Sequence, residues 1–518
     1  MKTKLVPIRG NIEEALYQVG LDEKASFKLL EERVNHLLSR SSFLRTGQEI
    51  LSKAKLRFSR RKDEEITFFQ RCVKSYAEGL GTDLNGYLNF LSLFEIAAHY
   101  GQKLPDLQAI LPGCTSVFLR TEEEISHTRL MDFPLTGIFE EKPRLYLWEK
   151  DGKPLLLTYS CEGLAPLFLQ GLHGNGISFA LHHKPGNNFY KEGAGVFEIL
   201  FDLLYQDLKP QGIKKDLKLI RTKTKWGFLF LDKNGRLENY DIEGPSFVQE
   251  HIDLPFNQPQ VLTNIPLRED DPALGDFIAF CQSREEWAHK KLKKSSRTHP
   301  LDLLTDVSDQ KNRNWSHPAA TLSTTGALWI NLTQGFLDIK EGEGALVASD
   351  PIVRVDLAVD NKIEVLKNAG KKNSFEMAWK KASLAQAYFD QEKFDRAYHE
   401  LQMARALIPG HPWEDIFQFF LCSWDFLLLP STKELSHVYK TLRELKLPKL
   451  LEGQQKLLIQ RIEKKLKLQY TINPSEVPPA VKKLFEQERD ANRALFSAWM
   501  GLIYPRMEQL TVHAPHLK

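Results

Sequence analysis

Residues 111–132 read LPGCTSVFLRTEEEISHTRLMD, a pattern typical of two short strands around a polar turn. Cys114 follows a glycine and precedes two hydroxyl residues and an apolar run. Arg129 comes fifteen residues later, and Asp132 three residues beyond it. If a β-turn joins two neighbouring strands, Cys114 at the start of the first strand faces Arg129 and Asp132 on the second.

A cysteine at a chain terminus carries its own general base, because its α-amino group accepts a proton near neutral pH and no histidine is needed. Cys114 is internal, so this chemistry requires cleavage between Gly113 and Cys114. Glycine suits that position, since a residue without Cβ leaves room for attack on its carbonyl. Asp132 would orient the amine, and Arg129 would surround the thiolate with positive charge or bind a substrate carbonyl. The residues alone leave ordinary strand packing open as the alternative.

Residues 1–113 are predicted to be mostly helical. Apolar residues recur at helical spacing in IEEALYQVGL, FKLLEERVNHLL and YLNFLSLFEIAAHY. We expect this region to be a helical pro-region or small subunit, separated by the cleavage at Gly113-Cys114. Its apolar faces, with Leu88, Leu91, Phe94 and Ile96 as examples, predict that it stays bound after cleavage.

After Cys114 the sequence changes to short apolar runs separated by turn residues. RLYLWEKDGKPLLLTYS turns at Asp151-Gly152, WGFLFLDKNGRLENYDI at Asn234-Gly235, and GALWINLTQGFLDIK near Gly335. Asp-Gly and Asn-Gly between apolar runs are strong hairpin signals. With amphipathic stretches between the hairpins, residues 114–350 predict an α+β domain in which antiparallel sheet packs against helices.

Residues 351–373 are predicted to be a linker, and residues 374–518 a helical domain. Small Ala397 and Ala404 would let two antiparallel helices approach closely. No second repeat is legible downstream, so both a plain scaffold and a groove for a protein partner stay open. Eight positions fall on the spacing of one tetratricopeptide repeat: Leu384, Ala385, Tyr388, Phe394, Ala397, Leu401, Ala404 and Pro409.

Composition narrows the function classes. The formal net charge is only +3, with 70 basic and 67 acidic residues interspersed, which gives no reason to expect nucleic acid. The start of the chain has no apolar signal region, and no stretch approaches the length of a membrane span. The sequence has five cysteines, too few and too scattered for a disulfide framework, which predicts a cytoplasmic protein. None of them forms a CxxC pair, and the sequence predicts no metal and no cofactor. The cysteines are Cys72, Cys114, Cys161, Cys281 and Cys422.

Five separated segments resemble the penicillin acyltransferase family, which is related to acid ceramidase, the N-acylethanolamine amidases and the conjugated bile salt hydrolases. The resemblance spans roughly residues 8–345 and does not include the C-terminal helices. Its segments are RGNIEEALYQVG with Gly10, Glu14 and Gly20; YAEGLGTDLNGYLNFLSLFE with Glu78, Gly79, Gly81 and Glu95; GCTS with Arg129 and Asp132; CEGLAPLFLQGLHGNGISFAL with Asn175, Gly176 and Ile177; and VLTNIPL with Thr263, Asn264 and Pro266.

The resemblance implies a four-layered αββα sandwich with the nucleophile at the start of a strand. It implies that Cys114 is the nucleophile in self-cleavage and on substrate, and that Arg129 and Asp132 position it. Asn264 would donate to the oxyanion, and Asn175 would be a second donor or a substrate contact. An arginine expected after the Thr-Asn strand would be Arg284 in QSREEW, although an alternative alignment puts Glu286 there.

We therefore expect an enzyme that hydrolyses a linear amide of a small molecule, or transfers its acyl group, through a thioester. One alternative is a helical-repeat interaction protein with an inactive hydrolase-like core. Another is a papain-like Cys–His protease. His182-His183, His299 and His317 are candidates for a metal site or a Cys–His dyad, but the pair before Lys184-Pro185 is expected to be solvent-exposed, since no acidic or cysteine partner lies at ligand spacing. Glu162 is expected to be either a general acid or a solvent-facing carboxylate at a strand end.

Overall fold

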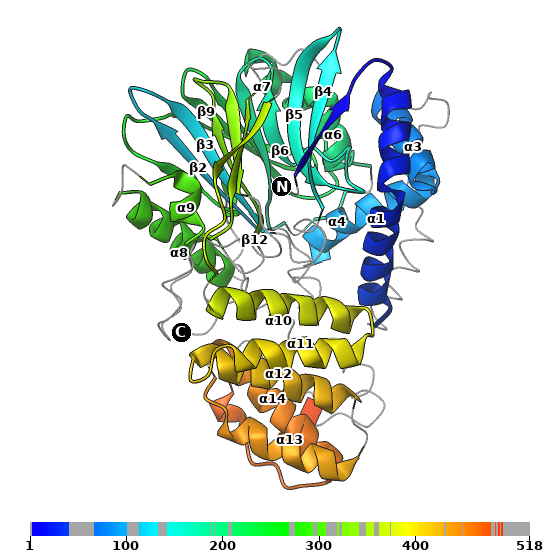
Figure 1. The fold of residues 1–518 in the computed structure, drawn as a ribbon, viewed down its shortest axis with the longest axis vertical. Helices are drawn as coiled ribbons and strands as arrows, with labels where there is room; N and C mark the ends of the chain where they lie inside the picture. Colours follow the sequence, from blue (N-terminus) through cyan, green and yellow to red (C-terminus); the bar gives the residue numbers. More distant parts are fainter. Residues whose placement is uncertain are drawn as a thin grey trace.

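The chain folds into two β-sheets with helices outside them and a stack of further helices below (Figure 1). This is the mixed α/β architecture that the hairpin-rich sequence predicts. The computed structural model describes residues 3–40, 67–100, 113–132, 142–186, 188–190, 192–205, 210–268, 275–293, 298–306, 319–320, 324–340, 349–356, 362–372, 374–428, 431–447, 449–477, 482, 485–486 and 488–489.

The first sheet, sheet A, has eight strands within the described residues, and only its β1–β4 pair is parallel. Two of the predicted hairpins, β4–β5 and β8–β9, are confirmed here. The turn between β4 and β5 places Asp151 and Gly152 at positive φ, the conformation for which Asp-Gly is suited. The strands in order are β1 (Lys4–Ile8), β4 (Pro143–Lys150), β5 (Lys153–Cys161), β6 (Gln170–His173), β7 (Ile177–His183), β8 (Trp226–Asp232), β9 (Arg236–Glu243) and β10 (Ser246–Asp253).

The second sheet, sheet B, is antiparallel throughout its seven described strands. It contains the predicted hairpin near Gly335, between β12 and β13. The predicted linker over residues 351–373 is wrong, because β14 and β15 lie within it and extend the sheet. The strands in order are β11 (Gln260–Leu262), β2 (Gly113–Arg120), β3 (Ile125–Asp132), β12 (Thr324–Asn331), β13 (Phe336–Lys340), β14 (Ile352–Asp356) and β15 (Lys362–Lys367).

The two sheets pack face to face, and β2 contacts β7 across the interface. One continuous apolar core includes Phe118 and Met131 of sheet B together with residues of sheet A and the helices outside it. Those helices are α1 (Ile12–Arg40), α3 (Phe68–Leu80), α4 (Leu84–Tyr100), α6 (Val196–Leu204) and α7 (Pro210–Leu219). A second core lies between sheet B and α8 (Gly275–Leu292) and α9 (Pro300–Leu304).

In its described residues the N-terminal region forms the helices α1, α3 and α4, and it also supplies strand β1 to the edge of sheet A. Its helices α1 and α3 cross at two glycines. A Cβ on Gly20 would lie 2.4 Å from the carbonyl oxygen of Tyr76, and one on Gly79 would lie 2.2 Å from that of Tyr17. These two positions of the family resemblance therefore allow two backbones to touch.

The predicted apolar faces of the N-terminal helices are buried where the structure describes them. Leu88 and Leu91 are 5% and 2% exposed. The side chains of Phe94 and Ile96 lie outside the described residues, as do residues 101–112 just before the expected cleavage position.

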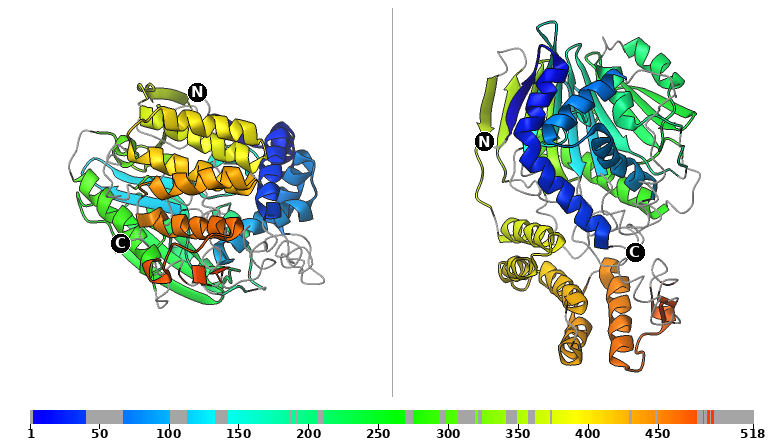
Figure 2. Two further views of the ribbon diagram at one scale, coloured as in Figure 1. Left: turned by 90° about the horizontal axis from the view of Figure 1, so that it is seen from below. Right: turned by 90° about the vertical axis from the view of Figure 1, so that its right-hand side faces the viewer.

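The helices after residue 373 stack below the sheets, as Figure 1 and the right-hand view of Figure 2 show. Ala385, Ala397 and Ala404 are fully buried where α10 packs on α11. Residues 490–518, the end of the predicted helical domain, lie outside the described residues. None of the helices in the described ranges has the length and apolar character needed to cross a bilayer. The helices are α10 (Ser374–Asp390), α11 (Phe394–Ala406), α12 (Pro412–Leu428), α13 (Thr432–Glu444) and α14 (Lys449–Leu466), followed by the short η3 (Pro474–Glu476).

Candidate active site around Cys114

Cys114 is the second residue of β2 and pairs with Met131 of β3. Its side chain is only 1% exposed. Nη2 of Arg129 donates to its sulfur over 2.9 Å, and the carbonyl oxygen of Leu181 on β7 lies 3.8 Å from the same atom. The candidate nucleophile therefore lies between the two sheets with a guanidinium against its sulfur.

Arg129 is fixed by the backbone of sheet A. Nη1 donates to the carbonyl oxygen of Leu169, and Nη2 donates to that of Leu181 as well as to Cys114. A guanidinium keeps its proton in proteins, so it stabilises negative charge on the sulfur. Of the two roles expected for Arg129, this geometry fits the electropositive setting for a thiolate, because both Nη atoms already bind the protein itself.

The backbone nitrogen of Cys114 donates to Oδ1 of Asn264, just after β11, over 2.9 Å. Arg284 donates to the same oxygen over 3.0 Å, and Nδ2 of Asn264 donates to the carbonyl oxygen of His183 over 2.8 Å. Two obligate donors at one end and a carbonyl at the other leave a single orientation for the amide. Asn264 therefore accepts from Cys114 in the intact chain, whereas the resemblance implies a donor to an oxyanion.

Asp132 and Arg284 form a buried ion pair behind β2. Nη1 of Arg284 lies 3.1 Å from Oδ2 of Asp132, and Thr324 donates to the other carboxylate oxygen. Burial alone would lower the pKa of Arg284, but Cys281 and Asp132 beside it outweigh burial and raise that pKa. Arg284 is fully buried, whereas Glu286 is exposed. The alignment that places Arg284 at the expected position therefore puts its residue in the site, and the alignment that places Glu286 there does not.

Gly113 lies directly against this ion pair. It pairs with Asp132 across the β2–β3 ladder, and a Cβ at this position would lie 2.7 Å from Oδ2 of Asp132. That contact is too close for any side chain unless the carboxylate moves, and Arg284 and Thr324 hold the carboxylate in place. The residue before Cys114 is therefore restricted to glycine by the site itself.

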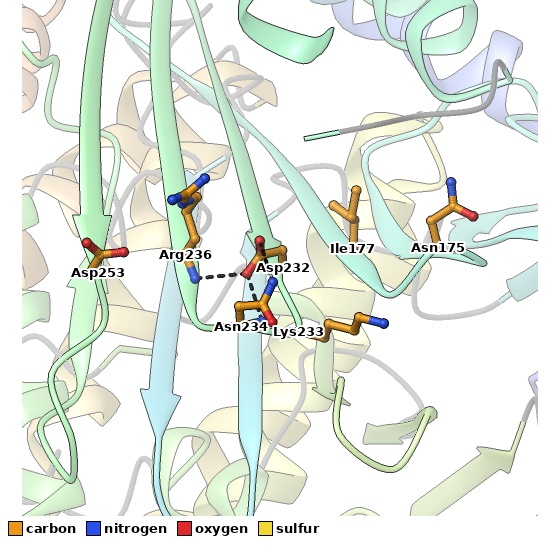
Figure 3. Close-up of a pocket in the computed structure, with 7 residues that line it drawn as sticks. All are labelled: Asn175, Ile177, Asp232, Lys233, Asn234, Arg236 and Asp253. Carbon is orange, nitrogen blue, oxygen red and sulfur yellow. Dashed lines mark hydrogen bonds between the residues drawn. The ribbon is translucent and has the colours of Figure 1, made fainter. Parts of the chain in front are cut away.

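The structure does not bring Asn175 to Cys114. Asn175 lies in the turn before β7, whereas the β7 residue that touches the sulfur is Leu181. Ile177, the first residue of β7, already lies four residues from Leu181, which is about 13 Å at roughly 3.3 Å per residue, and Asn175 lies farther away still. Asn175 instead lines a polar surface pocket (Figure 3) together with Ile177, Asp232, Lys233, Asn234, Arg236 and Asp253.

The expectation that His182 and His183 are solvent-exposed is wrong: they are 0% and 2% exposed. They end β7, where every second side chain turns toward sheet B. Nε2 of His182 lies 2.8 Å from Oγ of Ser116, and His127 contacts the same hydroxyl over 3.1 Å. Sequence reasoning missed this group, although the alternation Ser178-x-Ala180-x-His182 carries its signal.

The other histidines and Glu162 do not join the site. His299 lies 2.9 Å from Asp338 outside sheet B, and His317 lies outside the described residues. Glu162 pairs with Arg144 and accepts from the hydroxyl of Ser26 on α1. Glu162 therefore links α1 to the edge of sheet A. It is neither the general acid nor the solvent-facing carboxylate that the sequence predicts.

Comparisons with known proteins give only remote likeness. No protein-family model matches the chain, and no curated protein gives a significant match. Among solved structures, an N-acylethanolamine-hydrolyzing acid amidase ortholog from Caenorhabditis elegans is 14% identical, covers 42% of this chain and 93% of its own, and has a TM-score of 0.29. Penicillin V acylase from Agrobacterium tumefaciens is 13% identical, covers 49% of this chain and 91% of its own, and has a TM-score of 0.31. A variant of conjugated bile acid hydrolase from Clostridium perfringens is 15% identical, covers 50% of this chain and 99% of its own, and has a TM-score of 0.29. Likeness this low leaves the function to be argued from the site.

Proposed function

We propose that this chain is a self-cleaving cysteine enzyme of the N-terminal-nucleophile type, which hydrolyses a linear amide or transfers its acyl group. One observation carries the proposal. Both reacting atoms of Cys114 have the partners that this chemistry needs: Arg129 donates to Sγ, and Asn264 accepts from N. An ordinary buried cysteine in a strand needs no guanidinium on its sulfur, and its backbone N–H usually pairs with a carbonyl of the neighbouring strand rather than with a side-chain amide.

The first reaction is the cleavage itself. Sγ of Cys114 attacks the carbonyl carbon of Gly113, a C–S bond forms, and the C–N bond between the two residues breaks as the nitrogen takes up the thiol proton. Water then hydrolyses the thioester, which leaves Gly113 as a carboxylate and Cys114 with a free thiol and a free amine. Arg129 favours the step because it stabilises charge on the attacking sulfur.

The second reaction uses the new terminus. The α-amine of Cys114 accepts the thiol proton, and the thiolate attacks the carbonyl carbon of a substrate amide. The amine part of the substrate leaves with a proton, and the acyl group remains on sulfur as a thioester. Water or an acceptor amine then releases it. Asn264 Oδ1, already bonded to this nitrogen, would keep the amine beside the thiol.

The proposal extends to the architecture. Face-to-face sheets with α6 and α7 outside sheet A and α8 and α9 outside sheet B support a four-layered αββα sandwich. The buried alanines between α10 and α11 support an all-helical, tetratricopeptide-like C-terminal domain that is open to a protein partner. Five free cysteines support a reducing compartment such as the cytoplasm.

The decisive experiment is gel electrophoresis and mass spectrometry of the purified protein. Cleavage divides the 59.6 kDa chain into fragments of about 13 and 47 kDa, in proportion to 113 and 405 of its 518 residues, and the larger one begins at Cys114. Cys114→Ala should remain whole, whereas Cys422→Ala, which removes an equally buried thiol from α12, should cleave like the wild type. A wild-type chain that stays whole, or a Cys114→Ala chain that is cleaved, overturns the proposal.

The same sample tests the small-subunit proposal. Glu23 of α1 accepts from Tyr146 over 2.7 Å and from the backbone of Gly163 over 2.9 Å, both beyond the cleavage position. With β1 in sheet A, these bonds support a fragment that stays bound. The two fragments should co-elute in size-exclusion chromatography, and separate elution would show that residues 1–113 are a disposable pro-region.

A further inference from the structure

A chain of hydrogen bonds crosses from sheet B to sheet A beside Cys114. His127 contacts Ser178 through Nδ1 over 3.2 Å and Ser116 through Nε2 over 3.1 Å. Ser116 contacts Nε2 of His182 over 2.8 Å, and Nδ1 of His182 contacts the carbonyl oxygen of Thr263 over 3.0 Å. All four of the side chains in this chain of bonds are at most 1% exposed.

The direction of every hydrogen bond in this series follows from the last acceptor, the carbonyl oxygen of Thr263. A carbonyl oxygen only accepts, so Nδ1 of His182 carries the proton and its Nε2 accepts from the hydroxyl of Ser116. That hydroxyl has one hydrogen, so His127 must donate to it through Nε2 and accept from Ser178 through Nδ1. Neither imidazole is then available to Cys114, which argues against a Cys–His dyad.

Both rings must be neutral for this arrangement. Burial, followed by the charge of Arg129, lowers the pKa of His127 to about 3. The same two causes hold the pKa of His182 well below its usual range. The chain of bonds therefore keeps one fixed set of protons across the pH range in which the protein would work.

The last bond of this hydrogen-bond series is made to the segment that carries Asn264. The oxygen of Thr263 also accepts from Nζ of Lys184 over 3.0 Å, and Lys184 donates to the oxygen of Ile265. Nδ2 of Asn264 donates to the oxygen of His183. Three consecutive residues at the end of β7 thus bind three consecutive residues after β11.

Helix α8 holds the same segment from the other side. Glu285 accepts from the hydroxyl of Thr263 over 2.7 Å, and Arg284 donates to Oδ1 of Asn264 over 3.0 Å. The asparagine that accepts from the backbone nitrogen of Cys114 therefore has its position set by β7 on one side and by α8 on the other.

We infer that His182 is a positioning residue, which acts through Thr263 to hold Asn264 where it accepts the N–H of Cys114. The inference rests on the proposed self-cleaving function. His182 touches no reacting atom, and its contribution is the bond from Nδ1 to the Thr263 carbonyl. The bond that Nε2 accepts from Ser116 does not reach the segment that carries Asn264.

Two substitutions separate these bonds. The amide nitrogen of His182→Asn occupies the place of Nδ1 and can still donate to Thr263. The amide of His182→Gln reaches the place of Nε2 and can bind only Ser116. Both variants lose the ring, so their losses of thermal stability should be similar. Self-cleavage should remain within a few-fold of wild type in His182→Asn and should slow about 10²-fold in His182→Gln, the effect of misplacing a group by about 1 Å.

The rate is followed as the appearance of the fragment that begins at Cys114, with melting temperatures measured alongside. Ser178→Ala, which removes the far end of the chain of bonds, is the matched buried control and should cleave at the wild-type rate. Equal slowing of the Asn and Gln variants, or no slowing in either, overturns the inference while the wild type still cleaves. A wild type that stays whole overturns the proposed function and the inference with it. If His182→Gln does not fold, His182→Phe, which keeps a ring but has no donor for the Thr263 carbonyl, must slow cleavage instead, and an unchanged rate overturns the inference.

Discussion

Two regions of the molecule hold their most deeply buried carboxylates in opposite ways. Where the N-terminal helices dock on sheet A, Glu95 accepts from the backbone of Val196 over 2.6 Å, from the ring of Trp226 over 3.0 Å and from the hydroxyl of Thr224. Beside Cys114, Asp132 accepts from the guanidinium of Arg284. Glu95 in the docking region accepts from neutral donors, whereas Asp132 in the site is held in an ion pair.

The difference separates a structural interface from a site that must hold charge. Burial raises the pKa of Glu95 and of Glu23, although their hydrogen bonds offset part of the rise. Such groups can take up a proton without leaving a partner unpaired. An arginine cannot lose its charge, so removing either member of its pair leaves a buried charge alone. The substitutions that follow test this contrast and the contact of Gly113 with the ion pair.

Arg284→Met should have the largest effect. It leaves Asp132 buried without its cation, so the free energy of unfolding should fall by about 3–5 kcal/mol. The matched change in the docking region, Glu95→Gln, should cost only about 1 kcal/mol, because the donors there are neutral. Urea unfolding at neutral pH, followed by tryptophan fluorescence, measures both.

Adding Asp132→Asn to Arg284→Met should recover part of the loss, because the unpaired charge is gone. If the two regions lose the same stability, or if the double variant is no better than Arg284→Met, the contrast between them does not hold.

Gly113→Ala should have the next largest effect, on self-cleavage. Its Cβ would meet Oδ2 of Asp132 at 2.7 Å, and the peptide bond to be cut would have to move. We expect cleavage to slow about 10²-fold, with time courses read on denaturing gels. Gly212→Ala on α7 is the control, because the nearest atom to a Cβ there is 3.9 Å away. Cleavage of Gly113→Ala at the rate of that control would show that the site does not restrict this position.

The sequence predicts local pairings well and remote ones poorly. The hairpin at Asn234-Gly235 is readable because the turn residues and both partner strands are adjacent in the chain. β1 pairs with β4, some 140 residues away, and nothing local marks so short a strand. β14 lies in the predicted linker, although Arg354 and Asp356 alternate there with apolar residues in a strand pattern.

The site shows the same limit. Cys114, Arg129 and Asp132 could be placed together because β2 and β3 are consecutive strands. Asn264 bonds to Cys114 across 150 positions of sequence, and only the resemblance singled it out. His182 was assigned to the surface because a pair of histidines before Lys184 reads as polar, whereas packing of one sheet on another decides its burial.

The smallest effect is expected from Glu198→Gln on α6, in the docking region. Burial, with the nearby Asp202 as the next cause, raises the pKa of Glu198 to about 7. A carboxyl whose pKa is higher in the folded state contributes stability below its unfolded pKa and loses it as the pH rises through about 7. Glutamine stays neutral, so the variant should match the wild type near pH 4 and exceed it by up to about 3 kcal/mol near pH 8, the size that a rise from 4.5 to about 7 implies. Because every other titrating group is shared, the difference between the two unfolding curves isolates Glu198. A difference that shrinks as the pH rises would mean that Glu198 is charged in the folded protein, and that the docking region buries its carboxylates as the site does.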